Sequence, residues 1–291
     1  MQTLRRVGMD TAQLTDEELR YIDTRIVEAV RPALVGRRLF PVFKLPNAGY
    51  TSVRGYKKTD RQQARISLHG QGKNKDRVEL ASFDITVPVI HSEFTLWWRD
   101  LLASRNGGLP LETMEAEDCG RQCAEEEDKL LLSGEYTGWR ALGIQGLATT
   151  TGRNTTAGGD WSANAITYVS NAIAELETDG HYGPYSLVLR SSWYAQLRSL
   201  ISGTAVFLLE KVAELVKSGI YVSDNLYTSA GLTTNALVVE PSQENFELVI
   251  GQDLTTFMQQ DEDMNLQGKV FEVVAPRIKR PTSICEITGL T

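Results

Sequence analysis

The sequence predicts an α+β fold, and three features of the chain support that prediction. A long acidic helix is expected over residues 110–133, and a basic two-stranded arm is expected over residues 50–82. Beyond residue 145, strand-like and helix-like segments follow one another, as they do in mixed domains. The 291 residues are 42% hydrophobic and 23% charged, so the chain has the length and composition for a sizeable core.

The first predicted element is a helix over residues 14–31. Thr15 and Glu18 have the spacing of a capping box, in which each side chain bonds the backbone N–H of the other residue. Leu19, Ile22 and Ile26 repeat at helical spacing and form an apolar stripe. This helix could pack on its own domain, or it could lie on the inner face of a larger assembly as part of an N-terminal arm over residues 1–49.

The arm at residues 50–82 is polar and rich in glycine. Within residues 54–77, eight basic and two acidic side chains give a local charge of +6, although the whole chain carries −7. The arm has few apolar residues, and an isolated hairpin is marginally stable in water, so we expect it to lie on another surface. Its basic residues are Arg54, Lys57, Lys58, Arg61, Arg65, Lys73, Lys75 and Arg77.

The long helix is preceded by a strand in which Phe83, Ile85, Val87 and Val89 alternate with other residues. Pro110 suits a first helical turn, and Gly134 provides a stop. Only Arg121 and Lys129 oppose the acidic side chains of the helix, so its surface needs water or a basic partner. The acidic residues are Glu112, Glu115, Glu117, Asp118, Glu125, Glu126, Glu127 and Asp128. We expect the basic arm of a neighbouring copy to contact this helix.

A second domain is expected over residues 145–250. Asp160 or Ser162 is predicted to cap one helix, and Ser191 or Ser192 to cap the helix of residues 193–201. A short loop, Ser202-Gly203-Thr204, precedes a further helix with Leu208 and Val212. Residues 251–291 show strand character near 270–274 and 284–287. Pro276 and Pro281 are expected to interrupt these strands, which should return to the sheet begun at Phe83.

No residue pattern indicates catalysis. His69, His91 and His181 lack a zinc spacing, and no G-x-S-x-G motif is present. Cys119 and Cys123 are interpreted as small apolar residues, and three cysteines do not make a disulfide framework. No signal peptide and no membrane-spanning run is expected. We therefore expect a structural protein without catalytic residues, cofactor or metal; an α/β enzyme with a site built from scattered residues is the alternative.

An ordered set of motifs along nearly the whole chain resembles the encapsulin, or linocin-type, proteins. The set comprises LTDEELRYID (14–23), GRRLF (36–40), ELASFDITVPVIHSEFTLWWRDL (79–101), AEEEDKLLLSG (124–134), GIQGL (143–147), GPYSLVL (183–189), LEKVAELVKSGIYVS (209–223) and ELVIGQDL (247–254). The resemblance implies the Hong Kong 97-type fold of tailed-phage capsid proteins. In that fold residues 50–82 would be the E-loop, and residues 83–144 a peripheral domain with a spine helix. Residues 145–250 would be the apical domain, and residues 251–291 would return to the peripheral domain.

The same resemblance implies self-assembly of many copies, in pentamers or hexamers, into a closed icosahedral shell. Ser202, Gly203 and Thr204 would then lie near a symmetry-axis pore, and Leu19, Ile22 and Ile26 would lie on the inner face. Two kinds of shell fit. The long arm and the extended tail favour the major capsid protein of a tailed phage, which would enclose double-stranded DNA without sequence specificity in a virion assembled in the host cytoplasm. The alternative is a cytoplasmic encapsulin nanocompartment that encloses cargo enzymes.

Overall fold

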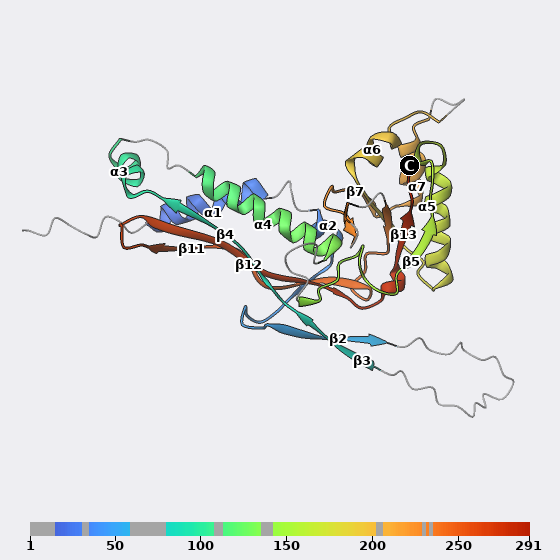
Figure 1. Cartoon of the computed structure of the whole chain (residues 1–291), viewed down its shortest axis with the longest axis horizontal. Coiled ribbons are helices and arrows are strands. Elements are labelled where there is room, and N and C mark those ends of the chain that lie inside the picture. Colours follow the sequence, from blue (N-terminus) through green and yellow to red (C-terminus); the bar gives the residue numbers. More distant parts are fainter. Residues whose placement is uncertain are drawn as a thin grey trace, which may run out of the picture.

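An elongated sheet and a shorter sheet organise the two halves of the chain (Figure 1). The computed structural model describes residues 15–30, 35–58, 80–107, 113–134, 142–201, 206–228, 231–232 and 235–291. In Figure 1 the elongated half carries helices along one face, and the other half gathers its helices beside the shorter sheet.

The elongated half is built on a four-stranded sheet. Its strands, in order, are β1 (Val42–Lys44), β11 (Phe246–Gln260), β12 (Leu266–Ile278) and β4 (Val89–Leu96). β1 runs parallel to β11, and the other neighbours are antiparallel. Three helices, α1 (Asp16–Val30), α3 (Trp98–Gly107) and α4 (Met114–Ser133), accompany this sheet. A buried apolar cluster that includes Phe94, Cys123 and Val270 holds α4 on the sheet, because α4 turns its small residues inward.

The other half has a five-stranded sheet with helices packed against it. Its strands, in order, are β5 (Asn154–Ala157), β13 (Ile284–Thr288), β10 (Ala236–Val239), β6 (Ser186–Leu189) and β7 (Gly219–Val222). The helices are α5 (Trp161–Thr178), α6 (Ser191–Leu197) and α7 (Leu208–Leu215). Trp161 is fully buried in this core, and its indole N–H donates to the carbonyl of Trp193 at 3.1 Å. The end of α4 joins the two halves, because Leu131 and Leu132 pack in one cluster with residues of both sheets.

Six smaller elements complete the described part of the architecture. Strands β2 (Ser52–Lys58) and β3 (Leu80–Thr86) pair antiparallel and form the base of the predicted arm (Figure 1). Helix α2 (Gly36–Leu39) links α1 to β1, and β8 (Tyr227–Thr228) pairs with β9 (Gly231–Leu232). A 3-10 turn, η3 (Pro281–Ser283), precedes β13. The ring of Phe83 covers Gly55 so closely that a Cβ there would lie 2.5 Å from it, which explains the glycine in β2.

Two predicted helix starts are confirmed. The Glu18 carboxylate accepts from the N–H of Thr15 at 2.8 Å, and the Thr15 hydroxyl accepts from the N–H of Glu18 at 3.3 Å. Asp160 caps α5 by accepting from the N–H of Ala163 at 3.3 Å. The spine helix is described from Met114 to Ser133, and residues 110–112 of the prediction lie outside the described residues.

Three other predictions are wrong. Neither Ser191 nor Ser192 caps α6, because both lie inside the helix and Arg190 is at the cap position; the Ser191 hydroxyl donates to Asp224 at 2.8 Å. Pro276 does not interrupt β12. It lies opposite Leu248 of β11, and the N–H and carbonyl of Leu248 point away from β12, since this N–H donates to the carbonyl of Pro41. The pairing of β11 with β12 therefore needs no N–H at position 276. Residues 284–287 do not return to the sheet begun at Phe83 but form β13 between β10 and β5.

Candidate functional site: charged surfaces of the elongated half

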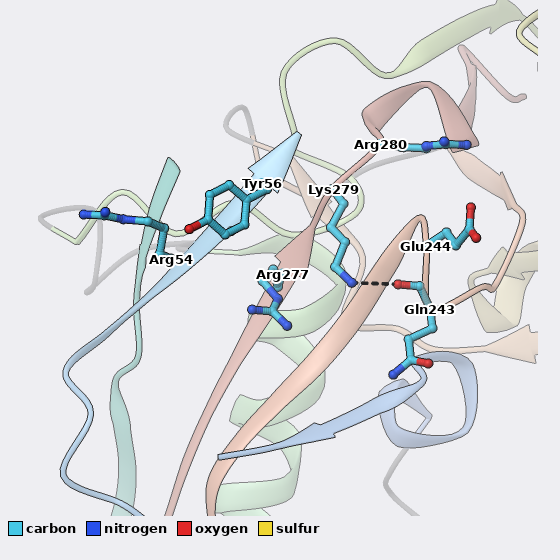
Figure 2. A pocket seen from close by; sticks show the side chains of 8 residues that line it. Arg54, Tyr56, Gln243, Glu244, Arg277, Lys279 and Arg280 are labelled. Atoms are coloured by element: carbon cyan, nitrogen blue, oxygen red, sulfur yellow. Dashed lines mark hydrogen bonds between the residues drawn. The ribbon is translucent and has the colours of Figure 1, made fainter. Parts of the chain in front are cut away.

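A basic pocket lies where the base of the arm meets the ends of β11 and β12. Its volume is about 420 Å³. Figure 2 shows the side chains that line it, with Arg54 and Arg280 at opposite sides. We call this set the basic pocket: Arg54, Gly55, Tyr56, Gln243, Glu244, Arg277, Lys279 and Arg280. Four basic side chains and one acidic side chain give the lining a net charge of +3.

A buried carboxylate holds two of these cations in place. Glu247 is 1% exposed and faces Arg277 across the β11–β12 pair. Its carboxylate accepts from Arg277 Nε at 2.5 Å and lies 3.0 Å from Lys279 Nζ. Lys279 Nζ also donates to the Gln243 carbonyl at 2.8 Å, the bond drawn in Figure 2. The guanidinium of Arg277 further stacks over Phe43 at 4.4 Å, so the pocket floor is rigid.

The two cations at the rim of the pocket, Arg54 and Arg280, are held less firmly than Arg277 and Lys279, which share a buried carboxylate. Arg54 pairs with Asp84 at 3.1 Å, and both side chains are 62% exposed. No ion pair of the Arg280 side chain is found among the residues that the structure describes. The pocket therefore presents fixed positive charge at its floor and exposed positive charge at its rim. Such an arrangement suits a negatively charged group.

A second charged cluster surrounds Arg37 on α2. Its guanidinium donates to Glu127 at 2.9 Å, to Asp253 at 2.5 Å and to Glu272 at 2.8 Å. Glu127 and Glu272 are each 1% exposed. Burial, together with the charge of Glu127, raises the pKa of Glu272 to about 9, although Arg37 acts in the opposite direction. One guanidinium thus compensates the buried carboxylates of α4 and β12, and this pair retains a proton at neutral pH.

Asp128 ties the chain before α2 to α4. Its carboxylate accepts from the N–H of Gly36 at 2.8 Å and of Val35 at 3.1 Å. Burial raises its pKa to about 6, although these two bonds act in the opposite direction. Glu127 and Asp128 are therefore engaged within their own chain. The expectation that all eight acidic residues of the spine helix meet a neighbour's arm has to be corrected for these two, because they face inward.

The remaining acidic residues of α4 lie mostly on its outer side. Glu115, Asp118, Glu125 and Glu126 are exposed, whereas Glu117 is half-buried and accepts from Thr113 at 2.9 Å. Asp118 pairs with Arg121 at 3.2 Å, and Glu126 pairs with Lys129 at 2.6 Å. Glu112 lies outside the described residues. The outer side of α4 therefore keeps negative charge beyond its own cations.

The predicted cationic arm is described only at its base. Arg54 lines the basic pocket, and Lys57 and Lys58 belong to β2. The other predicted arm cations, Arg61, Arg65, Lys73, Lys75 and Arg77, and the predicted pore residues Ser202, Gly203 and Thr204 lie outside the described residues. The structure thus brings together Arg54 and the run of cations at the end of β12. That run was visible in the sequence, but only the β11–β12 pairing puts it beside the arm.

Helix α1 lies against α4. Ile22 and Ile26 are buried in this contact, whereas Leu19 is half-buried. Gly120 makes the close approach possible, because a Cβ at this position would lie 2.7 Å from Ile26 Cγ2. Tyr21 and Val27 remain exposed on the opposite side of α1. A shallow depression of about 300 Å³ there is lined by Asp23, Thr24, Val27 and Glu28.

The described residues offer little for other classes of site. No group of three or more His, Cys, Asp and Glu side chains with the geometry of a metal site occurs among them. None of their helices combines the length and the apolar character needed to cross a membrane. All three cysteines are free and buried, in keeping with their interpretation as small apolar residues.

Comparisons with known proteins point to one family. Residues 1–275 match the Linocin_M18 family model, described as encapsulating protein for peroxidase. The type 1 encapsulin shell protein EncA of Myxococcus xanthus is 30% identical over 278 residues, which cover 95% of this chain and 94% of that protein. The diheme-cytochrome-encapsulin shell fusion protein of Kuenenia stuttgartiensis is 26% identical, with 94% of this chain and 73% of that protein covered.

Solved structures of capsid-like particles share the fold. A virus-like particle from Pyrococcus furiosus aligns with a TM-score of 0.71 at 19% identity, and the alignment covers 93% of this chain and 99% of the other. The capsid of the Myoviridae phage XM1 aligns with a TM-score of 0.64 at 14% identity, covering 100% of this chain and 99% of the other. At these identities the likeness concerns the arrangement of the backbone alone.

Proposed function

The chain belongs to the Linocin_M18 family of encapsulating proteins, and from this premise we propose that its copies assemble into a closed icosahedral shell around a protein cargo. The predicted α+β fold of the Hong Kong 97 type is confirmed by the structure and its capsid-like neighbours. The observation that carries the proposal is the family match over residues 1–275, together with 30% identity to an encapsulin shell protein along almost the entire length of both chains.

The cargo proposal replaces the phage capsid that the sequence favoured. The arm and the tail led to that preference, and both are compatible with either kind of shell. The phage capsid XM1 resembles this chain at only 14% identity, which speaks for a common fold and leaves the content of the particle open. The family description and the curated relatives name encapsulation, so a protein cargo has the better support.

We place the cargo contact on the exposed side of α1. Ile22 and Ile26 anchor this helix to α4, which leaves Val27 exposed to a partner, beside Tyr21, whose hydroxyl accepts from Arg25 Nε at 3.2 Å. The depression beside Val27 has about 300 Å³ and carries two carboxylates, from Asp23 and Glu28. A short segment with apolar and basic side chains suits such a surface. The pore at Ser202–Thr204 and the contact between the arm and the spine helix stay predictions.

The content of purified particles tests this proposal. The chain would be produced in its native host background, fractionated by size and viewed by electron microscopy. Closed particles that lack nucleic-acid absorbance and contain one enriched folded protein would support it. A 32.3 kDa monomer under all conditions would overturn the shell itself. Particles filled with DNA would overturn the protein cargo and return the viral alternative.

Cargo docking on α1 can be tested separately from assembly. Val27→Lys replaces the apolar side chain of the exposed depression with a cation that repels a basic segment, and it leaves the buried face of α1 unchanged, so particles should form but lose most of their cargo. Thr24→Ser is the matched control in the same depression and should load cargo normally. Cargo content per particle, measured by mass spectrometry, distinguishes these results. Unchanged loading of the Val27→Lys particles would exclude this depression as the docking surface.

A further inference from the structure

We propose that the acidic turn between β11 and β12 of one copy seats in the basic pocket of a neighbouring copy. The acidic turn consists of Asp261, Glu262 and Asp263. The inference rests on the proposed shell and adds a specific contact to it. The antiparallel pair of β11 and β12, called the ribbon below, carries a negative surface at one end and a positive surface at the other, and these surfaces of two different copies would bind each other.

The acidic turn has a defined shape. The Asp261 carboxylate accepts from the N–H of Asp263 at 3.0 Å and from the N–H of Asn265 at 2.8 Å. These bonds close the turn and leave the side chains of Glu262 and Asp263 exposed. Within the part of the chain that the structure describes, no ion pair involves either side chain. The turn is therefore a rigid convex surface with uncompensated negative charge.

The basic pocket is its complement in charge and in form. Its four cations exceed the carboxylates of Glu244 and buried Glu247 by a net charge of +2, and Glu247 fixes Arg277 and Lys279 before any partner arrives. Preorganised cations lose little side-chain entropy on binding, which favours a partner that brings carboxylates. Arg54 and Arg280 lie at opposite sides of the pocket with their guanidinium groups directed outward at its rim, so a partner that covers the pocket meets cations on both sides (Figure 2).

A copy cannot fill its own pocket. The pocket lies at the end of the ribbon where β11 begins, and the acidic turn lies where β11 ends, 15 residues later. At about 3.3 Å per residue the two are roughly 50 Å apart. Figure 1 shows the hairpin between β11 and β12 projecting away from the arm and from the five-stranded sheet. The contact is therefore head-to-tail between copies, and such contacts close into rings when the rotation permits it.

Exposed aromatic and apolar side chains lie near the acidic turn, and one exposed aromatic side chain lines the basic pocket. Trp97, Phe257 and Met264 are 58%, 57% and 46% exposed, and all three lie toward the hairpin end of the elongated sheet. Tyr56, which lines the pocket, is 53% exposed. Large aromatic residues together with arginine are the composition enriched at the centres of protein interfaces. The apolar groups would add burial to a contact whose register is set by charge.

Charge reversal on each side tests the contact. We would compare Arg54→Glu/Arg280→Glu, Glu262→Arg/Asp263→Arg and the combination of all four changes in one chain. Each pair alone should raise the concentration needed for closed particles at least about tenfold, because like charges then face each other. The combined chain should recover assembly, because a basic turn then meets an acidic pocket. Light scattering and electron microscopy give the readout, and circular dichroism reports folding of each subunit.

Charge-conserving changes at the same positions are the matched controls. Arg54→Lys/Arg280→Lys and Glu262→Asp/Asp263→Glu should assemble like the unmodified chain. If the unmodified chain forms particles and both reversals assemble equally well, the contact is overturned and the shell stands. Folded reversal variants that fail singly and are not rescued in combination also overturn it. If the unmodified chain forms no particles, the proposed shell fails first and this contact fails with it.

Discussion

At the scale of single residues, Arg37 forms ion pairs with three carboxylates in the described part of the chain. It donates to Glu127 and Glu272, which are each 1% exposed and together keep one proton, so it balances the remaining negative charge of this pair, and it also binds Asp253. Arg37→Met should lower the free energy of unfolding by about 3 kcal/mol or more, because buried carboxylates lose their counter-charge. Urea titration of the unassembled subunit measures this. Arg38→Met is the control on the same helix: Arg38 only stacks over Tyr221 at 5.5 Å, so its loss should cost about 1 kcal/mol or less.

The same cluster predicts how stability depends on pH. Burial raises the pKa of Glu272 to about 9 from the ordinary value of 4.5, so between these values the folded chain holds a proton that the unfolded chain has released. Stability should therefore be highest on the acidic side of this window. It should fall as the pH rises toward 9, by up to about 1.4 kcal/mol per pH unit for one proton. Glu272→Gln should flatten this slope in thermal unfolding measured from pH 5 to 10.

A second carboxylate provides the control for that pH series. Burial raises the pKa of Asp128 to about 6, so Asp128→Asn should flatten the curve only below about pH 6. The region between pH 6 and 9 should keep its slope in this variant. A Glu272→Gln chain with the same slope as the unmodified chain between pH 6 and 9 would contradict the assignment of the shared proton to the Glu127–Glu272 pair.

At the scale of elements, the contact between α1 and α4 depends on one missing side chain. A Cβ on Gly120 would lie 2.7 Å from Ile26 and 3.2 Å from Val30, so a side chain there must push α1 away. Gly120→Leu should therefore leave α4 helical but speed amide exchange throughout α1. Arg121→Leu, on the exposed side of α4, carries the same new side chain and should leave α1 protected. Unchanged exchange in Gly120→Leu would show that α1 is held by something other than this contact.

The elements also show what could be predicted from sequence and what could not. The starts of α1 and α5 were predictable because Thr15, Glu18 and Asp160 cap within three residues of their own position. The continuation of β12 through Pro276 could not be predicted, because it depends on whether the partner residue Leu248 directs its hydrogen bonds toward β12 or away from it.

At the candidate site, too, some charged features could be predicted from the sequence and others could not. The basic arm and the acidic helix are local features of composition. The burial of Glu127 and Asp128 depends on Arg37 and Gly36, about 90 residues earlier, and the basic pocket depends on strand pairing between β11 and β12. Sequence reasoning therefore found the charged segments, and only the fold separates the carboxylates that face inward from those that face outward.

At the scale of the whole molecule, the charge asymmetry predicts how the arm and α4 meet between copies. Single exposed ion pairs contribute only about 0.2–1 kcal/mol, so several must act together to fix the orientation of the arm. Reversal of Lys57, Lys58 and Arg61 to Glu should leave a folded subunit that no longer forms shells. Conversion of Glu115 and Glu125 to Lys on the outer side of α4 should restore assembly in the same chain, because both faces of the contact then change sign.

The reversed pair of surfaces distinguishes a specific contact from a general effect of net charge. The three arm substitutions lower the net charge from −7 to −13, and the two substitutions on α4 bring it back to −9. A chain that carries the arm reversal with Glu175→Lys and Glu210→Lys, both exposed and outside the proposed contacts, has the same net charge of −9 but an unaltered α4. It should stay unassembled at low salt if the arm docks on α4. Equal recovery of particles in both chains would assign the effect to net charge, and the arm would have no defined partner on α4.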